Sequence, residues 1–397
     1  MPTSRLAGRA DAFTPRDRSD RGVHPRFFLL YPPRRQPGGG HKQMRLLAQN
    51  ISRLGYECAL LRVDPTWDDG GYYGIDVPYT AFAPDAAPRS LVSSDVVLLP
   101  EYRLDYFLDF ARAWPGRKAV YAQGGFLALR DRPAKGYRAN GIEFVIAVSP
   151  YIAALAPFYL GMGSGRTHYV PYPVVRGPFA APAAAFETKR LAIAFMPRKL
   201  PDLIQKIRDR VQGRWPDVPW IEIDGVAEQE VVRRLDEAAI FLSTQNGEGF
   251  GLPAVEAMSR GCLVAGYPGS GLFPHPYANR RNGLWARDRS VRGAASQLLR
   301  AIDWVRMRDR RADSLSAEGH RTVERYTPTN AFEALRSALT FVMESGIGEK
   351  RPPRYRLGLL GHFQALRALQ VSRGLRRHPA SLDWAREGEP PARSGYR

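Results

Sequence analysis

The sequence predicts an α/β protein of two Rossmann-like domains that face each other across a cleft. Its 397 residues exceed what a single hydrophobic core usually organises. Short apolar segments alternate with helical patterns, and this alternation stops and then restarts further along the chain. A segment rich in proline and alanine lies near the restart, and we take residues 176–190 as the linker.

The first run, residues 26–175, is expected to form the N-terminal Rossmann-like domain. A loop rich in proline and glycine, 32–40, follows its first strand, and a helical pattern, 42–54, comes next. Short buried strands that alternate with helices form parallel sheets covered on both faces, so we expect that arrangement here. The expected strands are 26–31, 57–63, 95–99, 118–122 and 144–148.

The second run, residues 191–327, is expected to form the C-terminal Rossmann-like domain. A helix over 328–346 starts at a proline, and we expect it to cross back to the N-terminal domain. Residues 1–25 have mixed charge and few large apolar side chains, which predicts a disordered extension. The expected strands of the second run are 191–196, 220–223, 240–243 and 262–266, with helices at 200–212, 228–237 and 253–260.

Composition predicts an ordinary globular protein of a reducing compartment. Hydrophobic residues make up 44% of the chain, and no run of about 18 apolar residues predicts a membrane span. The N-terminus lacks the apolar centre of a secretory signal. The only cysteines are Cys58 and Cys262, which argues against a disulfide scaffold, so we expect a cytoplasmic protein.

The net charge of +19 permits more than one interpretation. Lysine supplies only 7 of the 58 basic residues, and so strong a preference for arginine is also typical of GC-rich genomes. The functional interpretation is attraction to polyanions such as nucleic acid, an anionic membrane face or phosphorylated small molecules. Charge alone does not separate these partners.

The basic tail, residues 347–397, contains a candidate membrane-binding segment. Residues 350–382 carry eight Lys or Arg and no Asp or Glu, and apolar residues recur there at helical spacing. A basic amphipathic helix can lie on an anionic membrane surface, and residues 350–377 are the candidate for that contact. The alternatives are a helix that docks on the protein itself and a solvated tail.

The segment 243–258, Ser-Thr-Gln-Asn-Gly-Glu-Gly-Phe-Gly-Leu-Pro-Ala-Val-Glu-Ala-Met, carries the most informative motif. It follows an apolar strand and runs into a helix whose start is marked by Pro253. Its three glycines allow sharp bends and close approach to a ligand, and the helix start offers free N–H groups to a phosphate. Glu248 lies in the loop and Glu256 about one turn into the helix, so one carboxylate could bind sugar hydroxyls and the other a ribose. The alternative is that both are ordinary surface glutamates.

This motif resembles that of the family 4 glycosyltransferases of the GT-B fold, in which two glutamates seven residues apart flank Gly-Phe-Gly. Glu248-Gly-Phe-Gly-Leu-Pro-Ala-Val-Glu256 matches it, and the likeness covers most of residues 190–345. Over 26–175 the likeness is architectural. It implies that this N-terminal half is the acceptor-side domain and that residues 191–327 form the nucleotide-sugar donor domain. The resemblance implies that Glu248 contacts the donor sugar and Glu256 the ribose. It also implies that the backbone of Gly249, Phe250, Gly251 and Leu252 lines the donor site and meets the sugar diphosphate.

Arg198 and Lys199 are the candidate cations for that diphosphate. They follow the first strand of the second half, at a carboxyl edge where open α/β sheets bind ligands. The family usually places a lysine about five residues after the arginine, but position 203 is leucine here. Either Lys199 has taken that role or Lys206 substitutes, and the alternative is a surface cluster in an arginine-rich chain.

The N-terminal half offers a second glycine loop, Gly38-Gly39-Gly40-His41. It lacks the Gly-Lys-Ser/Thr ending of a Walker loop and resembles the flexible loop that GT-B enzymes place beside acceptor and diphosphate. Gln123, with the two glycines after it, follows another strand and is a further candidate to line the cleft. A plain surface loop is the alternative, and a lone histidine such as His41 is more often structural.

The resemblance implies a retaining transfer of a sugar, with a nucleotide sugar as donor substrate and a saccharide or lipid-linked acceptor. The departing phosphate would take the acceptor's proton, so positioning and electrostatic stabilisation would supply most of the acceleration. The sequence contains no Asp-x-Asp, so we expect no required metal and no cofactor. Bacterial surface polysaccharide or glycolipid assembly is the expected context, with no specific nucleic acid bound. The rival interpretations are a GT-B epimerase or phosphorylase, a nucleic-acid-binding protein and an inactive homologue.

Overall fold

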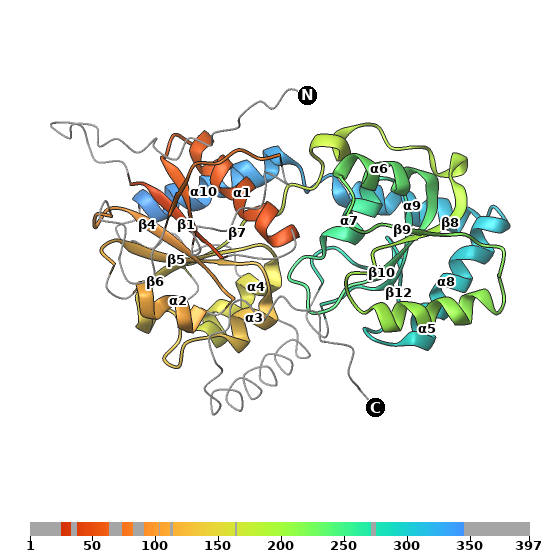
Figure 1. Cartoon of the computed structure of the whole chain (residues 1–397), viewed down its shortest axis with the longest axis horizontal. Helices are drawn as coiled ribbons and strands as arrows, with labels where there is room; N and C mark the ends of the chain where they lie inside the picture. The colour runs from red at the N-terminus through yellow and green to blue at the C-terminus, as the bar shows by residue number, and fades with distance from the viewer. Residues whose placement is uncertain are drawn as a thin grey trace, which may run out of the picture.

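The computed structural model describes residues 25–32, 38–62, 74–81, 91–102, 104–111, 114–162, 165–270 and 275–344. Two parallel β-sheets lie side by side, each covered by helices (Figure 1). The prediction of two Rossmann-like halves is therefore confirmed. Residues 1–24 of the expected extension and the whole tail, 347–397, lie outside the described residues, as does the membrane-binding segment 350–377.

The first sheet has seven strands in the order β3-β2-β1-β4-β5-β6-β7. All its pairings are parallel, and the neighbouring strands β2, β1 and β4 are buried along their whole length, as a sheet covered on both faces requires. The strands are β1 Phe27–Tyr31, β2 Cys58–Arg62, β3 Tyr79–Ala81, β4 Val96–Pro100, β5 Arg117–Ala122, β6 Ile142–Ala147 and β7 Thr167–Tyr169. The helices are α1 Gly39–Arg53, α2 Leu104–Ala111, α3 Gly125–Arg130 and α4 Pro150–Leu155.

The second sheet has five parallel strands in the order β12-β11-β10-β8-β9. Its strands are β8 Arg190–Phe195, β9 Trp220–Glu222, β10 Ala238–Thr244, β11 Leu263–Tyr267 and β12 Leu284–Trp285. Its helices are α5 Pro201–Gln212, α6 Glu228–Glu237, α7 Leu252–Ser259, α8 Val291–Arg306 and α9 Arg310–Val323.

The last described helix, α10 (Pro328–Glu344), returns to the first domain and packs against α1 and β7 (Figure 1). Phe341 of α10 contacts the His168 ring, with centroids 5.1 Å apart. The Arg117 guanidinium donates a hydrogen bond of 3.3 Å to the carbonyl oxygen of Val342. The end of the described chain is thus fixed to the N-terminal domain.

Both sheets have a topological switch point, where ligands of open α/β folds bind. In the first sheet the chain leaves β1 on one side and returns to β4 on the other, so the loops after β1 and β4 diverge. In the second sheet β8 is flanked by β9 and β10, so the loops after β8 and β10 diverge in the same way. These loops contain Gly38, Arg198, Lys199 and Glu248, which is where the sequence placed the site.

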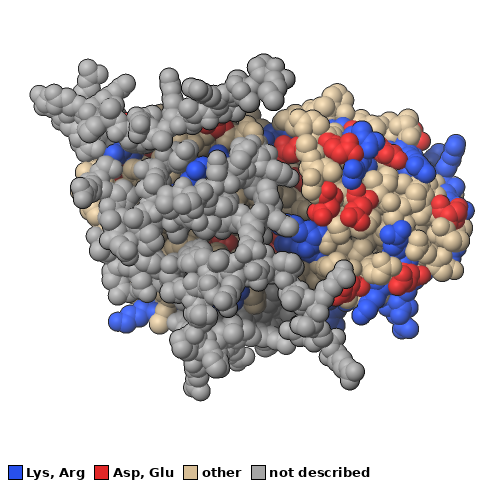
Figure 2. Space-filling view, viewed as in Figure 1, with Lys and Arg blue, Asp and Glu red and all other residues tan. Residues whose placement is uncertain are grey.

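The face of the C-terminal domain seen in Figure 2 carries basic and acidic side chains interspersed. The domain also contains ion pairs within single helices. Arg233 pairs with Glu230 in α6, and Arg321 pairs with Glu318 in α9. Such exposed pairs contribute little to stability. None of the helices in the described ranges has the length and apolarity that a membrane span requires.

Candidate active site

The loop between β10 and α7 is shaped by glycines. Gly251 immediately precedes Leu252, the first residue of α7, and has a left-handed φ of 83°. A Cβ atom at Gly251 would lie 1.6 Å from Oε1 of Gln245, so no other residue fits without displacing that side chain. The Tyr277 hydroxyl donates a 2.5 Å hydrogen bond to the carbonyl oxygen of Gly251. The loop therefore delivers the free N–H groups of the α7 start in a fixed orientation.

Phe250 anchors this loop through its side chain. The ring is 1% exposed and packs edge-on against Tyr326, Tyr172 and Tyr277, with centroid distances of 4.9, 5.1 and 5.6 Å. Tyr172 belongs to the segment before the linker, so this aromatic cluster joins the two domains. Because the ring is committed to packing, any contact of Phe250 with a ligand has to come from its backbone.

Glu248 and Lys199 form an ion pair at the switch point of the second sheet. Lys199 lies in the loop after β8 and Glu248 in the loop after β10. Because β8 and β10 are neighbouring parallel strands, both loops start at the same edge of the sheet, and the two charges meet there. Their side chains are 39% and 22% exposed, which leaves both accessible to a ligand. The Glu248 backbone is held on one side by its N–H, which donates a 2.9 Å hydrogen bond to the carbonyl oxygen of Gly269.

Arg198 occupies a different position from its neighbour. It is exposed and forms no ion pair with the residues that the structure describes. Leu200, two residues later, has a left-handed φ of 55°, an uncommon conformation for a leucine that is enriched at functional sites. Lys206, the alternative cation, is exposed on α5 and lines a separate surface pocket with Asp209, Arg210 and Val291. The structure therefore brings Lys199, and not Lys206, to Glu248.

Loops of the N-terminal domain closely approach the loop between β10 and α7. A Cβ atom on Gly39 would lie 3.0 Å from Cδ1 of Leu252, and one on Gly40 would lie 3.0 Å from Oε1 of Gln123. A Cβ atom on Gly249 would lie 1.7 Å from the carbonyl oxygen of Gln123. The loops that begin at Gly38, at Gln123 and at Glu248 therefore converge, as a site between two domains requires.

Gln123 and His41 are both held by neighbours within the N-terminal half. The Tyr172 hydroxyl donates a 2.8 Å hydrogen bond to Oε1 of Gln123. His41 is buried; its Nε2 lies 2.8 Å from the carbonyl oxygen of Pro32, and its ring packs edge-on against Tyr31 at 4.9 Å. These contacts of His41 hold the start of α1 against the end of β1.

Glu256 lies in a charged cluster that sequence reasoning missed. Its side chain is 14% exposed and its Oε1 is 4.0 Å from Nζ of Lys42, on α1 of the opposite domain. Lys42 also pairs with Glu228, at the start of α6, and Arg176 lies 3.4 Å from the same carboxylate. The pKa of Lys42 is lowered to about 8, chiefly by burial; Glu256 opposes this shift and Arg176 adds to it. The one signal in the sequence was the position of Lys42 directly behind the glycine loop.

Glu101 is a second residue that the sequence did not single out. It follows β4 at the carboxyl edge of the first sheet and is 4% exposed. Burial raises its pKa to about 7, although hydrogen bonds from the backbone N–H groups of Gln123 and Gly124 favour the charged form. Its place after a strand at the switch point could have identified it, because that edge is where such residues collect.

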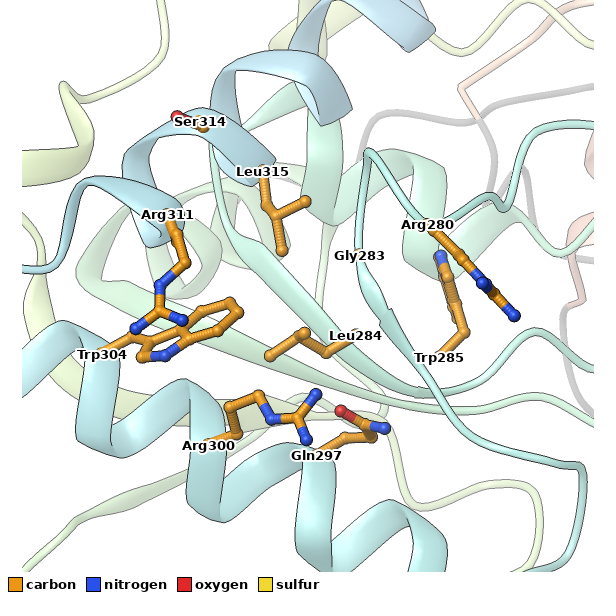
Figure 3. A pocket seen from close by; sticks show the side chains of 10 residues that line it. All are labelled: Arg280, Gly283, Leu284, Trp285, Gln297, Arg300, Trp304, Arg311, Ser314 and Leu315. Atoms are coloured by element: carbon orange, nitrogen blue, oxygen red, sulfur yellow. The ribbon is translucent and has the colours of Figure 1, made fainter.

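The surface pockets lie away from these loops. A concavity of about 550 Å³ lies between β12, α8 and α9 (Figure 3). Three arginines, Arg280, Arg300 and Arg311, line it with two tryptophans, and Arg311 stacks on Trp304 at 4.6 Å. It contains none of the residues predicted for the donor site. The described residues contain no group of three or more His, Cys, Asp or Glu that could hold a metal ion, and the expectation of a metal-independent site stays a prediction.

Comparison with known proteins agrees with this architecture. No known family profile matches the chain. An alpha-1,6-glucosyltransferase of Actinobacillus pleuropneumoniae serotype 7 (strain AP76) is 32% identical over 87 residues, 22% of this chain and 26% of that protein. The chain thus matches about a quarter of the length of this curated relative.

Solved structures match over far more of the chain. TarM of S. aureus, solved as a G117R mutant with Fondaparinux, alpha-GlcNAc-glycerol and UDP, has a TM-score of 0.58 at 9% identity, covering 80% of this chain and 99% of TarM. Alr3699/HepE of Anabaena, with UDP and glucose, has a TM-score of 0.58 at 13% identity, covering 80% and 100%. The lipopolysaccharide outer core galactosyltransferase WaaB has a TM-score of 0.55 at 13% identity, covering 79% and 99%. The resemblance inferred from the sequence is confirmed at the level of the fold: this chain has the two-domain GT-B fold of these glycosyltransferases.

Proposed function

We propose that the protein is a retaining glycosyltransferase that moves a sugar from a nucleoside-diphosphate sugar to a saccharide or glycolipid acceptor. The observation that carries this proposal is the convergence of Glu248, Lys199 and the start of α7 on the N-terminal loops at Gly39 and Gln123. The two switch points supply one side of the site each, so donor and acceptor can be brought together between the domains.

The residues of the donor loop fit a sugar diphosphate in their chemistry. The N–H groups at the start of α7 and the positive end of its dipole favour a phosphate. Lys199 and Arg198 are placed at the same edge and would neutralise the charge that grows on the leaving diphosphate. Glu248 would accept hydrogen bonds from the sugar hydroxyls, and Glu256 from the ribose.

The transfer itself needs positioning more than proton chemistry from the protein. The bond between the anomeric carbon and the diphosphate oxygen breaks while the acceptor oxygen forms its bond on the same face. The departing phosphate oxygen takes the acceptor's proton, so the protein has to hold the reactants together and stabilise the leaving charge. We propose that no metal ion takes part.

The similar proteins suggest the substrates. TarM and Alr3699/HepE were solved with UDP, and WaaB is a lipopolysaccharide outer core galactosyltransferase. We therefore propose a role in bacterial surface polysaccharide or glycolipid synthesis, with a uracil nucleotide among the first donors to try. We also propose that residues 350–377 bind an anionic membrane surface from the cytoplasmic side, because their charge is wholly basic.

Calorimetric titration with UDP, GDP, ADP and dTDP tests the donor site. The wild-type protein is expected to bind one of them, and Glu256→Ala is expected to weaken that binding. Glu318→Gln is the matched control, because Glu318 is a glutamate on α9 that pairs, among the described residues, with Arg321 of its own helix. A protein that binds none of the four nucleotides but binds nucleic acid with a steep salt dependence would instead be a polyanion-binding protein.

Liposome sedimentation tests the membrane proposal separately. The full chain is expected to sediment with vesicles that contain anionic phospholipid and to be released by salt. The chain without residues 347–397 is expected to stay in the supernatant. Equal sedimentation of the two forms would contradict a role for the tail.

A further inference from the structure

Lys42, on α1 of the N-terminal domain, lies against two carboxylates of the C-terminal domain. It lies in the first turn of α1, four residues after Gly38, and its ammonium pairs with Glu228 and lies 4.0 Å from Glu256. Glu228 begins α6 and Glu256 lies in α7, so a single side chain bridges to two helices of the C-terminal domain.

The surroundings of Lys42 contain charged groups from three directions. Glu228 faces it from α6 and Glu256 from α7, while Arg176, from the segment after β7, pairs with Glu228 at 3.4 Å. The Phe179 ring lies 5.9 Å from the ammonium and covers another side. Two cations and two carboxylates therefore balance in this cluster.

The cluster is largely removed from solvent. The side chains of Lys42, Glu256 and Arg176 are 13%, 14% and 17% exposed, whereas Glu228, at the rim of the cluster, is 32% exposed. A buried charge that loses its partner is strongly unfavourable, whereas one with partners is retained. Each member consequently constrains where the others can lie.

We propose that Lys42 is a positioning residue that links domain closure to donor binding. It holds the carboxylate of Glu256 in the orientation that accepts a ribose, and it does so only when the two domains are together. This inference rests on the ribose-binding role proposed for Glu256. It assigns the N-terminal domain a part in recognising the nucleotide of the donor, besides its part in binding the acceptor.

Lys42 is charged at neutral pH. Burial lowers the pKa of Lys42 to about 8, so the ammonium form, which attracts Glu228 and Glu256, predominates at pH 7. An arginine at this position would carry the same charge and could form the same ion pairs.

Three variants separate these effects: Lys42→Met, Lys42→Arg and, as a matched control, Lys135→Met, which removes an exposed lysine of the same domain. Domain closure is followed by small-angle X-ray scattering. Affinity is followed by calorimetry with UDP, GDP, ADP and dTDP at pH 7. Lys42→Met is expected to have a larger radius of gyration and to bind its nucleotide roughly tenfold more weakly, a size typical of removing a side chain that orients a ligand-binding group. Lys42→Arg keeps the charge and is expected to bind the nucleotide with nearly the wild-type affinity.

The outcomes distinguish this proposal from the one on which it rests. If the wild-type protein binds a nucleotide and Lys42→Met binds it equally well with unchanged dimensions, the positioning role is wrong and the donor site stands. If Lys42→Arg binds the nucleotide as weakly as Lys42→Met does, the charge of Lys42 does not orient Glu256 and the positioning role is wrong. If the wild-type protein binds none of the four nucleotides, the donor site itself is wrong and the role of Lys42 is wrong with it.

Discussion

The hydroxyl of Tyr151 donates a 2.8 Å hydrogen bond to the carbonyl oxygen of Glu248, which joins α4 of the N-terminal domain to the donor loop of the C-terminal domain. Tyr151 is buried, and burial raises the pKa of its hydroxyl, so it remains a donor over the whole working range of pH. The loop that carries the proposed sugar-binding carboxylate is thus held partly by the opposite domain. The contact between the two domains therefore also positions the loop of the proposed donor site.

Removing that hydroxyl is expected to impair catalysis more than folding. Tyr151→Phe keeps the ring and leaves the Glu248 carbonyl without this donor, a loss of about 0.5–1.5 kcal/mol for an ordinary hydrogen bond. We expect kcat to fall about threefold to tenfold, with the melting temperature little changed. Steady-state kinetics with the preferred donor measures this. Tyr56→Phe serves as the control, since Tyr56 packs edge-on against Phe27 outside the site.

Gly249 is expected to tolerate no side chain in the closed protein. A Cβ atom there would lie 1.7 Å from the carbonyl oxygen of Gln123. Because this neighbour is backbone and cannot rotate away as a side chain could, the two domains would have to move apart. Gly249→Ala is expected to lower kcat/KM about 100-fold, the scale of a misplacement of about 1 Å in an active site. Gly213→Ala, where the new atom meets its nearest neighbour at 3.5 Å, is the matched control. Wild-type kinetics in Gly249→Ala would show that the loops do not meet during turnover.

Glu101 is expected to make stability depend on pH between about 4.5 and 7. Its folded-state pKa is raised to about 7 by burial, so the folded protein holds a proton that the unfolded chain releases. The stability that this proton provides is complete below the unfolded pKa and is lost as the pH rises through about 7. Denaturant unfolding at pH 5 and pH 8 should show a loss of up to about 3 kcal/mol that Glu101→Gln abolishes. Glu57→Gln, at an exposed position, should leave the pH dependence as in the wild type.

Lys199 is expected to matter for turnover more than Lys206 does. Lys199 pairs with Glu248, whereas Lys206 lies exposed on α5. Loss of a cation that stabilises the leaving diphosphate typically lowers kcat by about 100-fold or more. We expect that loss for Lys199→Met and near-normal kinetics for Lys206→Met. The reverse order would place the diphosphate against α5.

The sequence predicted the parallel sheets well because buried parallel strands are continuous apolar runs. The strands expected at 26–31 and 240–243 correspond to β1 and β10, with ends shifted by one or two residues. The strands β3, β7 and β12 were missed, since they have three, three and two residues and lie at or near the edges of their sheets. A strand that short carries no periodicity of its own and forms because its neighbour offers unpaired backbone groups.

The donor loop was predictable for a different reason. Gly251 and Pro253 impose the turn and the helix start locally, and the spacing of Glu248 and Glu256 is set by the loop and helix that carry them. The cluster of Lys42 with Glu228 and Arg176 was not predictable, because its members come from separate parts of the chain and no local pattern links them. Only the packing of α1 against the C-terminal domain makes Lys42 a neighbour of Glu256.

Release of nucleoside diphosphate from a panel of UDP-, GDP-, ADP- and dTDP-sugars, compared between the wild type and Glu256→Ala, tests the central claim most directly. We expect release from one donor in the wild-type protein, with that turnover lost in the variant, and a product that keeps the donor's anomeric configuration. No release from any donor with a saccharide or glycolipid acceptor present, or equal release by the Glu256→Ala variant, would contradict a glycosyltransferase site at Glu248 and Glu256.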